Sequence, residues 1–147
     1  MNQPIAPDHH DAELVLRLYD LRRETVMRQH RALFLKEFWP RNSAEATEVV
    51  RTDHPLNVAY RQVTTYWEMA YALCRHGTLN PELLLDSSAE GMFIYARIEP
   101  YVADLRTAAN NPRVLKSTEW IATQTAIGNE VMAIQRARVI KMLAARG

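Results

Sequence analysis

Apolar residues recur at helical spacing from Ala12 to Trp39, where they form three stripes around the predicted helix. Only one narrow strip of this segment is strongly polar, and it comprises Arg17, Asp20, Glu24, Arg28 and Arg31. A helix that is apolar around most of its circumference must be covered on more than one side. We therefore expect this segment to be packed within a helical bundle and against a second copy of the chain.

Prolines, glycines and capping residues divide the rest of the chain into further helices. We expect these helices over residues 42–50, 55–76, 81–86, 89–110 and 112–145. Pro100 lies inside one of them and should kink or break it near residues 96–99. Gly128 is a candidate for a second break. No segment of useful length alternates between apolar and polar residues as a strand would.

These patterns predict an all-α fold, an irregular bundle of five to seven helices with the first and third helices at its centre. The 147 residues fall within the size range of one domain, so we expect residues 1–147 to form a single helical domain. Residues 1–10 are expected to be a flexible tail. With only 4 glycines, the chain is poorly suited to turn-rich β folds and to phosphate-binding loops.

The charge balance disfavours nucleic-acid binding. The chain has 18 basic and 17 acidic residues, a formal net charge of +1, whereas nucleic-acid binders usually carry a marked basic excess. The single Cys74 is typical of a reducing compartment. The longest apolar run, residues 69–74, is far too short to span a membrane, and no secretory signal is visible. We expect a cytoplasmic protein without a membrane span.

No metal, cofactor or nucleophile signature is present in the sequence. None of the histidines is placed four residues from another, and neither H-E-x-x-H nor E-x-x-H occurs. His9 and His10, between two aspartates, form at best a weak metal site. Cys74 falls on an apolar stripe and is most simply a small buried residue. The sequence therefore predicts no metal, no cofactor and no catalytic residue.

Two carboxylates have mainly apolar and aromatic neighbours and are the candidates for acid–base chemistry. Glu68 lies on the predicted helix that carries Trp67 and Tyr71, and Glu99 lies where Pro100 disturbs its helix. A carboxyl group in such a setting can have a raised pKa and act as a general acid. The alternative, which we favour, is that both carboxylates form surface ion pairs with arginines. The candidate pocket comprises Glu68, Glu99, Trp67 and Tyr71.

Three short motifs resemble a family of small bacterial all-helical domains of unknown function. They are Tyr66-Trp67-Glu68 in the central predicted helix, the turn Gly77-Thr-Leu-Asn-Pro81, and Arg97-Ile-Glu-Pro-Tyr101. The resemblance covers about the middle half of the chain. It implies an all-helical fold and no particular chemistry. Many members of that family begin with a membrane-spanning helix, which this sequence lacks.

The first functional hypothesis is a non-enzymatic protein-interaction or regulatory module that forms a homodimer, with an unidentified protein partner as a further possibility. The predicted interface lies on the first helix and comprises Val15, Tyr19, Val26 and Leu33. The alternative is an enzyme or small-molecule binder with a pocket between helices, lined by aromatic residues and a carboxylate. A closed pocket with a buried carboxylate would favour the alternative, and an exposed apolar patch would favour the interaction module.

Overall fold

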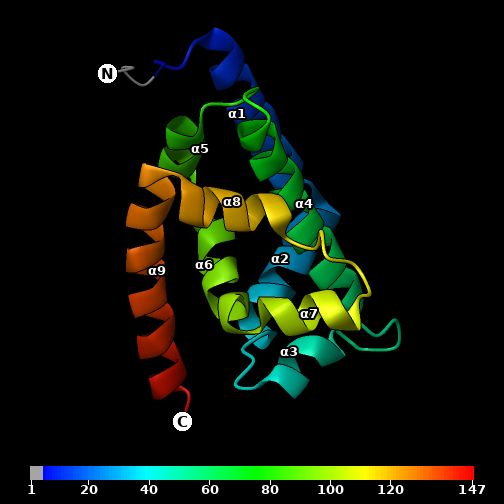
Figure 1. Ribbon diagram of the computed structural model, residues 1–147. Helices are drawn as coiled ribbons and strands as arrows, with labels where there is room; N and C mark the ends of the chain where they lie inside the picture. Colours follow the sequence, from blue (N-terminus) through cyan, green and yellow to red (C-terminus); the bar gives the residue numbers. More distant parts are fainter. Residues whose placement is uncertain (1–4) are drawn as a thin grey trace.

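The computed structural model describes residues 5–147, which form nine α-helices and one short 3-10 helix, with no strand among them (Figure 1). The elements are α1 (His9–Arg23), α2 (Thr25–Glu37), α3 (Ser43–Glu48), α4 (Asn57–Arg75), α5 (Pro81–Ser87), α6 (Glu90–Ile98), η1 (Glu99–Tyr101), α7 (Val102–Ala108), α8 (Lys116–Gln124) and α9 (Ala126–Ala145). The all-α class is thus confirmed, but the predicted number of five to seven helices was too low.

The predicted first helix is interrupted at Glu24. The backbone of this residue is extended, with φ −56° and ψ 141°, so α1 ends before it and α2 begins after it. The Glu24 carboxylate accepts hydrogen bonds from the backbone N–H groups of Val26 and Met27, and it thereby caps α2. Glutamate is not among the preferred capping residues, and the apolar pattern continues through the break. For these two reasons, the sequence pattern does not reveal the break between α1 and α2.

The predicted signals that end the central helix and begin the next one are confirmed. Gly77 ends α4 in the left-handed conformation, at φ +77°. The Gly77 N–H donates to the Cys74 carbonyl, and the Thr78 N–H donates to the Leu73 carbonyl. This is the bonding pattern of a Schellman motif. The Asn80 side chain then accepts from the Leu83 N–H and caps α5, which Pro81 opens.

The helices predicted over residues 89–110 and 112–145 are each broken, as expected, and the later break lies close to Gly128. Pro100 lies in η1, which separates α6 from α7, so its predicted break is confirmed. The later break falls at Thr125 rather than Gly128, because the Thr125 hydroxyl accepts from the Gly128 N–H and caps α9. A Cβ atom at Gly128 would overlap the carbonyl oxygen of Ile121. Glycine is therefore required here by close packing of α9 on α8.

α6 is the most enclosed helix, since every residue from Gly91 to Ile98 is buried. In Figure 1, α9 runs along one side of α6, α4 and α2 lie on the other, and α8 crosses between α4 and α9. α4 is central, as predicted for the third helix. α1 is not, because only Leu18 and Arg22 of α1 are buried. The first predicted helix therefore extends from the centre of the bundle to its edge.

The N-terminal segment begins in an ordered cap. Asp8 accepts hydrogen bonds from the backbone of His10 and Asp11, and the Asp11 carboxylate accepts from the Asp8 N–H, so α1 starts at His9. The tail predicted over residues 1–10 thus includes two helical residues, and residues 1–4 lie outside the described part of the chain.

Candidate functional site

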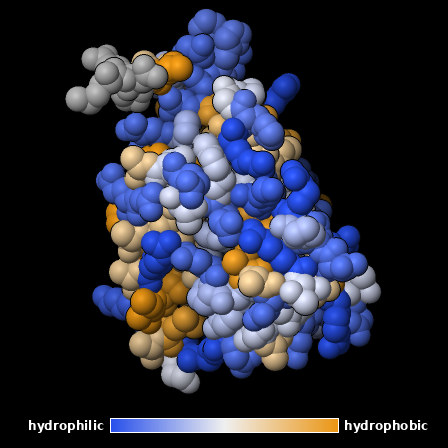
Figure 2. Space-filling model, viewed as in Figure 1, coloured by the Kyte–Doolittle hydropathy of each residue, from blue (hydrophilic) through white to orange (hydrophobic). Residues whose placement is uncertain are grey.

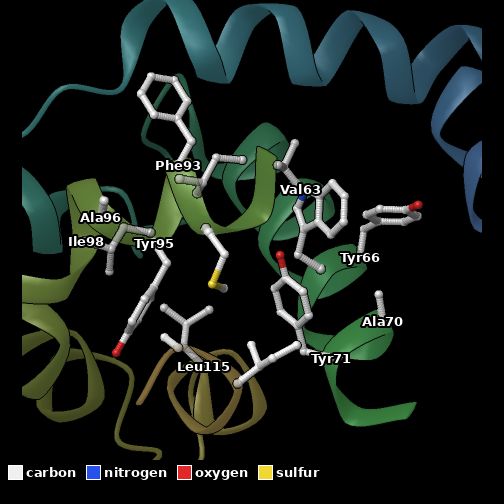
Figure 3. Close-up of a cluster of buried hydrophobic side chains, with 14 of the residues drawn as sticks. Val63, Tyr66, Ala70, Tyr71, Phe93, Tyr95, Ala96, Ile98 and Leu115 are labelled. Atoms are coloured by element: carbon white, nitrogen blue, oxygen red, sulfur yellow. The ribbon is translucent and has the colours of Figure 1, made fainter. Parts of the chain in front are cut away.

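Two of the four predicted pocket residues belong to the hydrophobic core. Trp67 and Tyr71 are buried on α4, and their rings stack with centroids 5.7 Å apart. Figure 3 shows Tyr71 with Val63 above it and Tyr66 and Leu115 on either side, and none of its surface is exposed. These aromatic residues contribute to stability through burial, and they offer no surface to a ligand from solvent.

Glu68 is held by the start of α8. Its carboxylate accepts hydrogen bonds of 2.8 Å from the backbone N–H groups of Ser117 and Thr118, and a third of 2.8 Å from the Thr118 hydroxyl. The residue before α8, Leu115, has φ +57° and its side chain caps nothing. Glu68 on α4 therefore supplies the cap that α8 lacks locally, at the helix end that favours negative charge. This contact was not foreseen, because it joins residues 49 and 50 positions apart.

A cavity of about 330 Å³ adjoins Glu68, between α4 and the segment 109–115. Tyr60 and Arg61 also line it. Burial raises the pKa of Tyr60 to about 12, so its hydroxyl stays protonated at neutral pH. Because the Glu68 carboxylate already accepts three hydrogen bonds, this cavity offers no free general base.

Glu99 lies in a different part of the molecule from Glu68. It forms an ion pair with Arg136 of α9, in which Nε and Nη2 donate at 3.0–3.2 Å. The two residues line a second cavity of about 230 Å³ between η1 and α9. The structure thus places the two candidate carboxylates beside separate cavities. The surface ion pair favoured for Glu99 exists, with Arg136 as the partner.

Cys74 and the histidines offer no reactive or metal-binding cluster within residues 5–147. Cys74 is buried, and burial raises the pKa of its thiol to about 12, so the nucleophilic thiolate is scarce at neutral pH. The rings of His9 and His10 lie 4.6 Å apart. In the described part of the chain, no three His, Cys, Asp or Glu side chains are grouped so that they could hold a metal ion.

The predicted interface residues are divided by the break between α1 and α2. Val15 on α1 is half-buried. Tyr19 is exposed, but the guanidinium groups of Arg22 and Arg23 lie 5.5 and 5.2 Å from the centre of its ring. The two residues on α2, Val26 and Leu33, remain exposed. A surface for association is therefore best sought on α2 and its neighbour α4.

α2 and α4 run antiparallel and share an outward face. The start of α4 lies beside the end of α2, since the rings of Tyr60 and Phe38 are 6.4 Å apart, and the Tyr66 hydroxyl reaches back to Leu18 of α1. His30 Nδ1 lies 2.5 Å from Gln62 Oε1 and joins the two helices on their outer side. We call this surface the α2–α4 face; its members are Val26, His30, Leu33, Val58, Gln62 and Met69.

Helical spacing explains why these residues share one surface. Val26 and Leu33 lie four residues before and three after His30, and Val58 and Met69 lie four before and seven after Gln62. Residues at such spacings lie along one side of a helix. Each helix thus has one row of these residues, and the bond between His30 and Gln62 places the two rows side by side. The exposed apolar side chains of α2 and α4 therefore lie on the same face of the molecule.

A family model described as "Domain of unknown function (DUF4760)" matches residues 7–125 of the chain. The chain belongs to the DUF4760 family. This confirms the resemblance to helical domains of unknown function, over a longer segment than the three motifs covered. No curated protein matches the chain. No solved structure matches it either.

The match to DUF4760 ends at the capping residue of α9, so α9 lies outside the matched residues. α9 nevertheless packs against α5, α6 and α8 of the DUF4760 domain. Among residues 5–147, no helix combines the length and the apolar character needed to cross a bilayer.

The DUF4760 domain contains a half-buried ion pair that sequence reasoning missed. Arg31 of α2 donates from Nε to Glu90 of α6 at 2.8 Å, and its Nη2 contacts the second carboxylate oxygen. Glu90 also accepts from the indole N–H of Trp67 at 3.3 Å. The carboxylate raises the pKa of Arg31, chiefly through the side-chain hydrogen bond. The only sequence signal was the position of Arg31 in the polar strip of the first predicted helix, which favours exposure rather than burial.

Arg97 of α6 is buried and has no carboxylate partner among the described residues. Its Nη1 donates to the carbonyls of Leu35 and Phe38, at 3.0 and 2.9 Å. Its guanidinium carbon lies 3.6 Å from the centre of the Trp39 ring and 4.4 Å from that of Phe93. Burial, followed by the positive charges of neighbouring arginines, lowers the pKa of Arg97 to about 9, so it remains charged at neutral pH.

Proposed function

We propose that this DUF4760 domain is a non-enzymatic interaction module that forms a homodimer through the α2–α4 face. The observation that carries the proposal is the exposure of four large apolar side chains on this face. The four residues are Leu33, Val26, Met69 and Val58, and each has between 40% and 48% of its surface exposed. Single exposed apolar residues are ordinary, whereas several on one surface often mark an interface.

The geometry of the face suits a symmetric contact. It is formed by two antiparallel helices, so a two-fold axis through it would bring four helices together in an antiparallel bundle. His30 and Gln62 occupy its middle, and none of its six members is a carboxylate, a lysine or an arginine. The exposed Glu37 and Arg61 lie beside these members at helical spacing, so the charges that border the contact are of both signs.

The free thiol supports a cytoplasmic location for such a module. Cys74 is buried and unpaired, and buried free cysteines are common in proteins of reducing compartments.

Small-molecule binding at the cavity beside Glu68 is supported less well. The cavity is of about 330 Å³, within the range of ligand sites, and Tyr60 lines it. However, the Glu68 carboxylate is committed to capping α8, and Trp67 and Tyr71 are packed in the core. The combination of aromatic residues and a free carboxylate that this alternative requires is therefore not assembled.

The proposal can be tested by placing a carboxylate on the face. Leu33→Glu and Val58→Glu should each convert the dimer to a monomer in light scattering, because a desolvated charge would face its own copy. Ile134→Glu, at an exposed apolar position on α9, is the matched control and should leave the dimer intact. Circular dichroism should show unchanged helix content in all three variants. Dimers that persist in both face variants would reject this interface.

A further inference from the structure

The surroundings of Arg97 combine a buried cation with an open apolar cavity. Arg97 is only 3% exposed, and it lines the cavity of about 230 Å³ between η1 and α9. We propose that this cavity binds a small organic anion, a carboxylate carried on a short apolar body.

The charges around Arg97 are unbalanced in favour of an anion. Arg138 lies over the Phe93 ring at 4.5 Å and Arg146 over the Trp39 ring at 4.6 Å, so two further guanidinium groups lie near Arg97, behind the cavity wall and outside its lining. Arginine is rarely buried unless it is paired. A carboxylate bound here would supply the countercharge that the described residues do not provide.

Arg97 also has unused hydrogen-bonding capacity. Its Nη1 is occupied by the Leu35 and Phe38 carbonyls, and its Nε is enclosed by protein, where a ligand in the cavity does not reach it. Its Nη2 has no hydrogen-bond partner within residues 5–147 and is not enclosed, so this nitrogen is the one left to donate to a bound carboxylate. A charged donor without a partner costs free energy, which a bound anion would recover.

The other residues of the cavity wall determine the polarity and size of the part of the ligand that carries the carboxylate. Ala96, Val139, Ile140 and Leu143 give it an apolar wall. The one carboxylate in the wall, Glu99, is neutralised by its bonds to Arg136. Figure 2 shows hydrophobic residues gathered over the C-terminal half of α9, which carries three of these side chains. The volume of about 230 Å³ equals roughly eight water molecules at ~30 Å³ each, which suits a short-chain acid and is too small for a helix.

Calorimetric titration with hexanoate tests the proposal, with 1-hexanol, acetate and inorganic phosphate as comparison probes. Hexanoate should bind and should change the fluorescence of Trp39, whose ring lies against Arg97. The other three should bind at least about tenfold more weakly, because each lacks either the charge or the apolar body. Equal binding of hexanol or phosphate, or no binding of hexanoate, would overturn the proposal.

Variants separate binding at this cavity from binding elsewhere. Arg97→Met should weaken hexanoate binding at least about tenfold, through loss of a charge-assisted hydrogen bond. Since that variant also loses two bonds to α2, Leu143→Trp provides a second test: it keeps Arg97 and fills the cavity from its half-buried wall. It should abolish binding without lowering the melting temperature. Arg17→Gln, on the exposed side of α1, is the control and should bind as wild type. Binding that survives Leu143→Trp would contradict the assignment.

Discussion

Arg31 and Glu90, 59 positions apart in the sequence, form a largely buried ion pair in which both oxygens of the carboxylate are engaged. Their side chains are 23% and 14% exposed. Arg31 also donates from Nη1 to the Arg22 carbonyl near the end of α1, and Glu90 accepts from Trp67 of α4. This pair therefore connects α1, α2, α4 and α6.

Glu90→Gln should destabilise the fold by about 2–4 kcal/mol, because it leaves the Arg31 charge without a partner in a largely buried position. Urea denaturation measures the change. The double variant Arg31→Met/Glu90→Gln should be less destabilised than the sum of its two single variants, since it buries no unpaired charge. Additive effects in this cycle would show that the two side chains do not depend on each other.

Glu68→Ala should lower the stability by about 1–2 kcal/mol, since it removes the cap from the first N–H groups of α8. The loss should appear as faster amide hydrogen exchange in α8 than in α5. Glu130→Gln, which removes an exposed carboxylate from α9, is the control and should leave both quantities unchanged. Equal exchange of α8 in the Glu68 variant and wild type would contradict the capping role.

Cys74 should make the fold sensitive to alkali. Burial raises the pKa of its thiol from 9.0 to about 12, so the folded state retains a proton that the unfolded state releases. The stabilisation is complete below pH 9 and is lost at about 1.4 kcal/mol per pH unit as the pH rises from 9 towards 12. Cys74→Ala should flatten the fall in unfolding free energy between about pH 9 and pH 10, where the thiol of the unfolded chain is ionised to a greater extent than its tyrosines. The same slope in both proteins would contradict this account.

Deletion of residues 139–147 should lower the melting temperature. Val139 is buried, Leu143 is half-buried, and the side chain of Arg146 donates to the Lys36 carbonyl at 2.9 Å. Loss of these contacts exposes apolar surface of α6 to water. Removal of Gly147 alone is the control and should have no effect. An unchanged melting temperature for the longer deletion would show that the end of α9 does not stabilise the fold.

Local signals in the sequence predicted much of the helical architecture. The glycine that ends α4, the asparagine that caps α5 and the proline that separates α6 from α7 each act within a few residues. Such residues have strong intrinsic preferences for turns and helix ends. Glu24 and Leu115 have none for the backbone conformations that they adopt here, so the start of α2 and the start of α8 could not be predicted.

The candidate sites were harder to predict because they depend on contacts between distant residues. The sequence assigned Glu68 to a pocket or a surface pair, whereas it caps a helix 49 positions later. It also gave no reason to expect a buried Arg97, since charged residues are usually exposed. The predicted first-helix interface assumed one continuous helix, and the break at Glu24 leaves Val26 and Leu33 on α2 beside α4.

The proposal that α2 and α4 mediate self-association is tested most directly by the molar mass of the purified chain. Sedimentation equilibrium across the micromolar range should give twice the 16.9 kDa of one chain. Leu33→Glu should sediment at 16.9 kDa under the same conditions, while Ile134→Glu sediments as the dimer. A wild-type mass of 16.9 kDa at every concentration in this range would contradict the account.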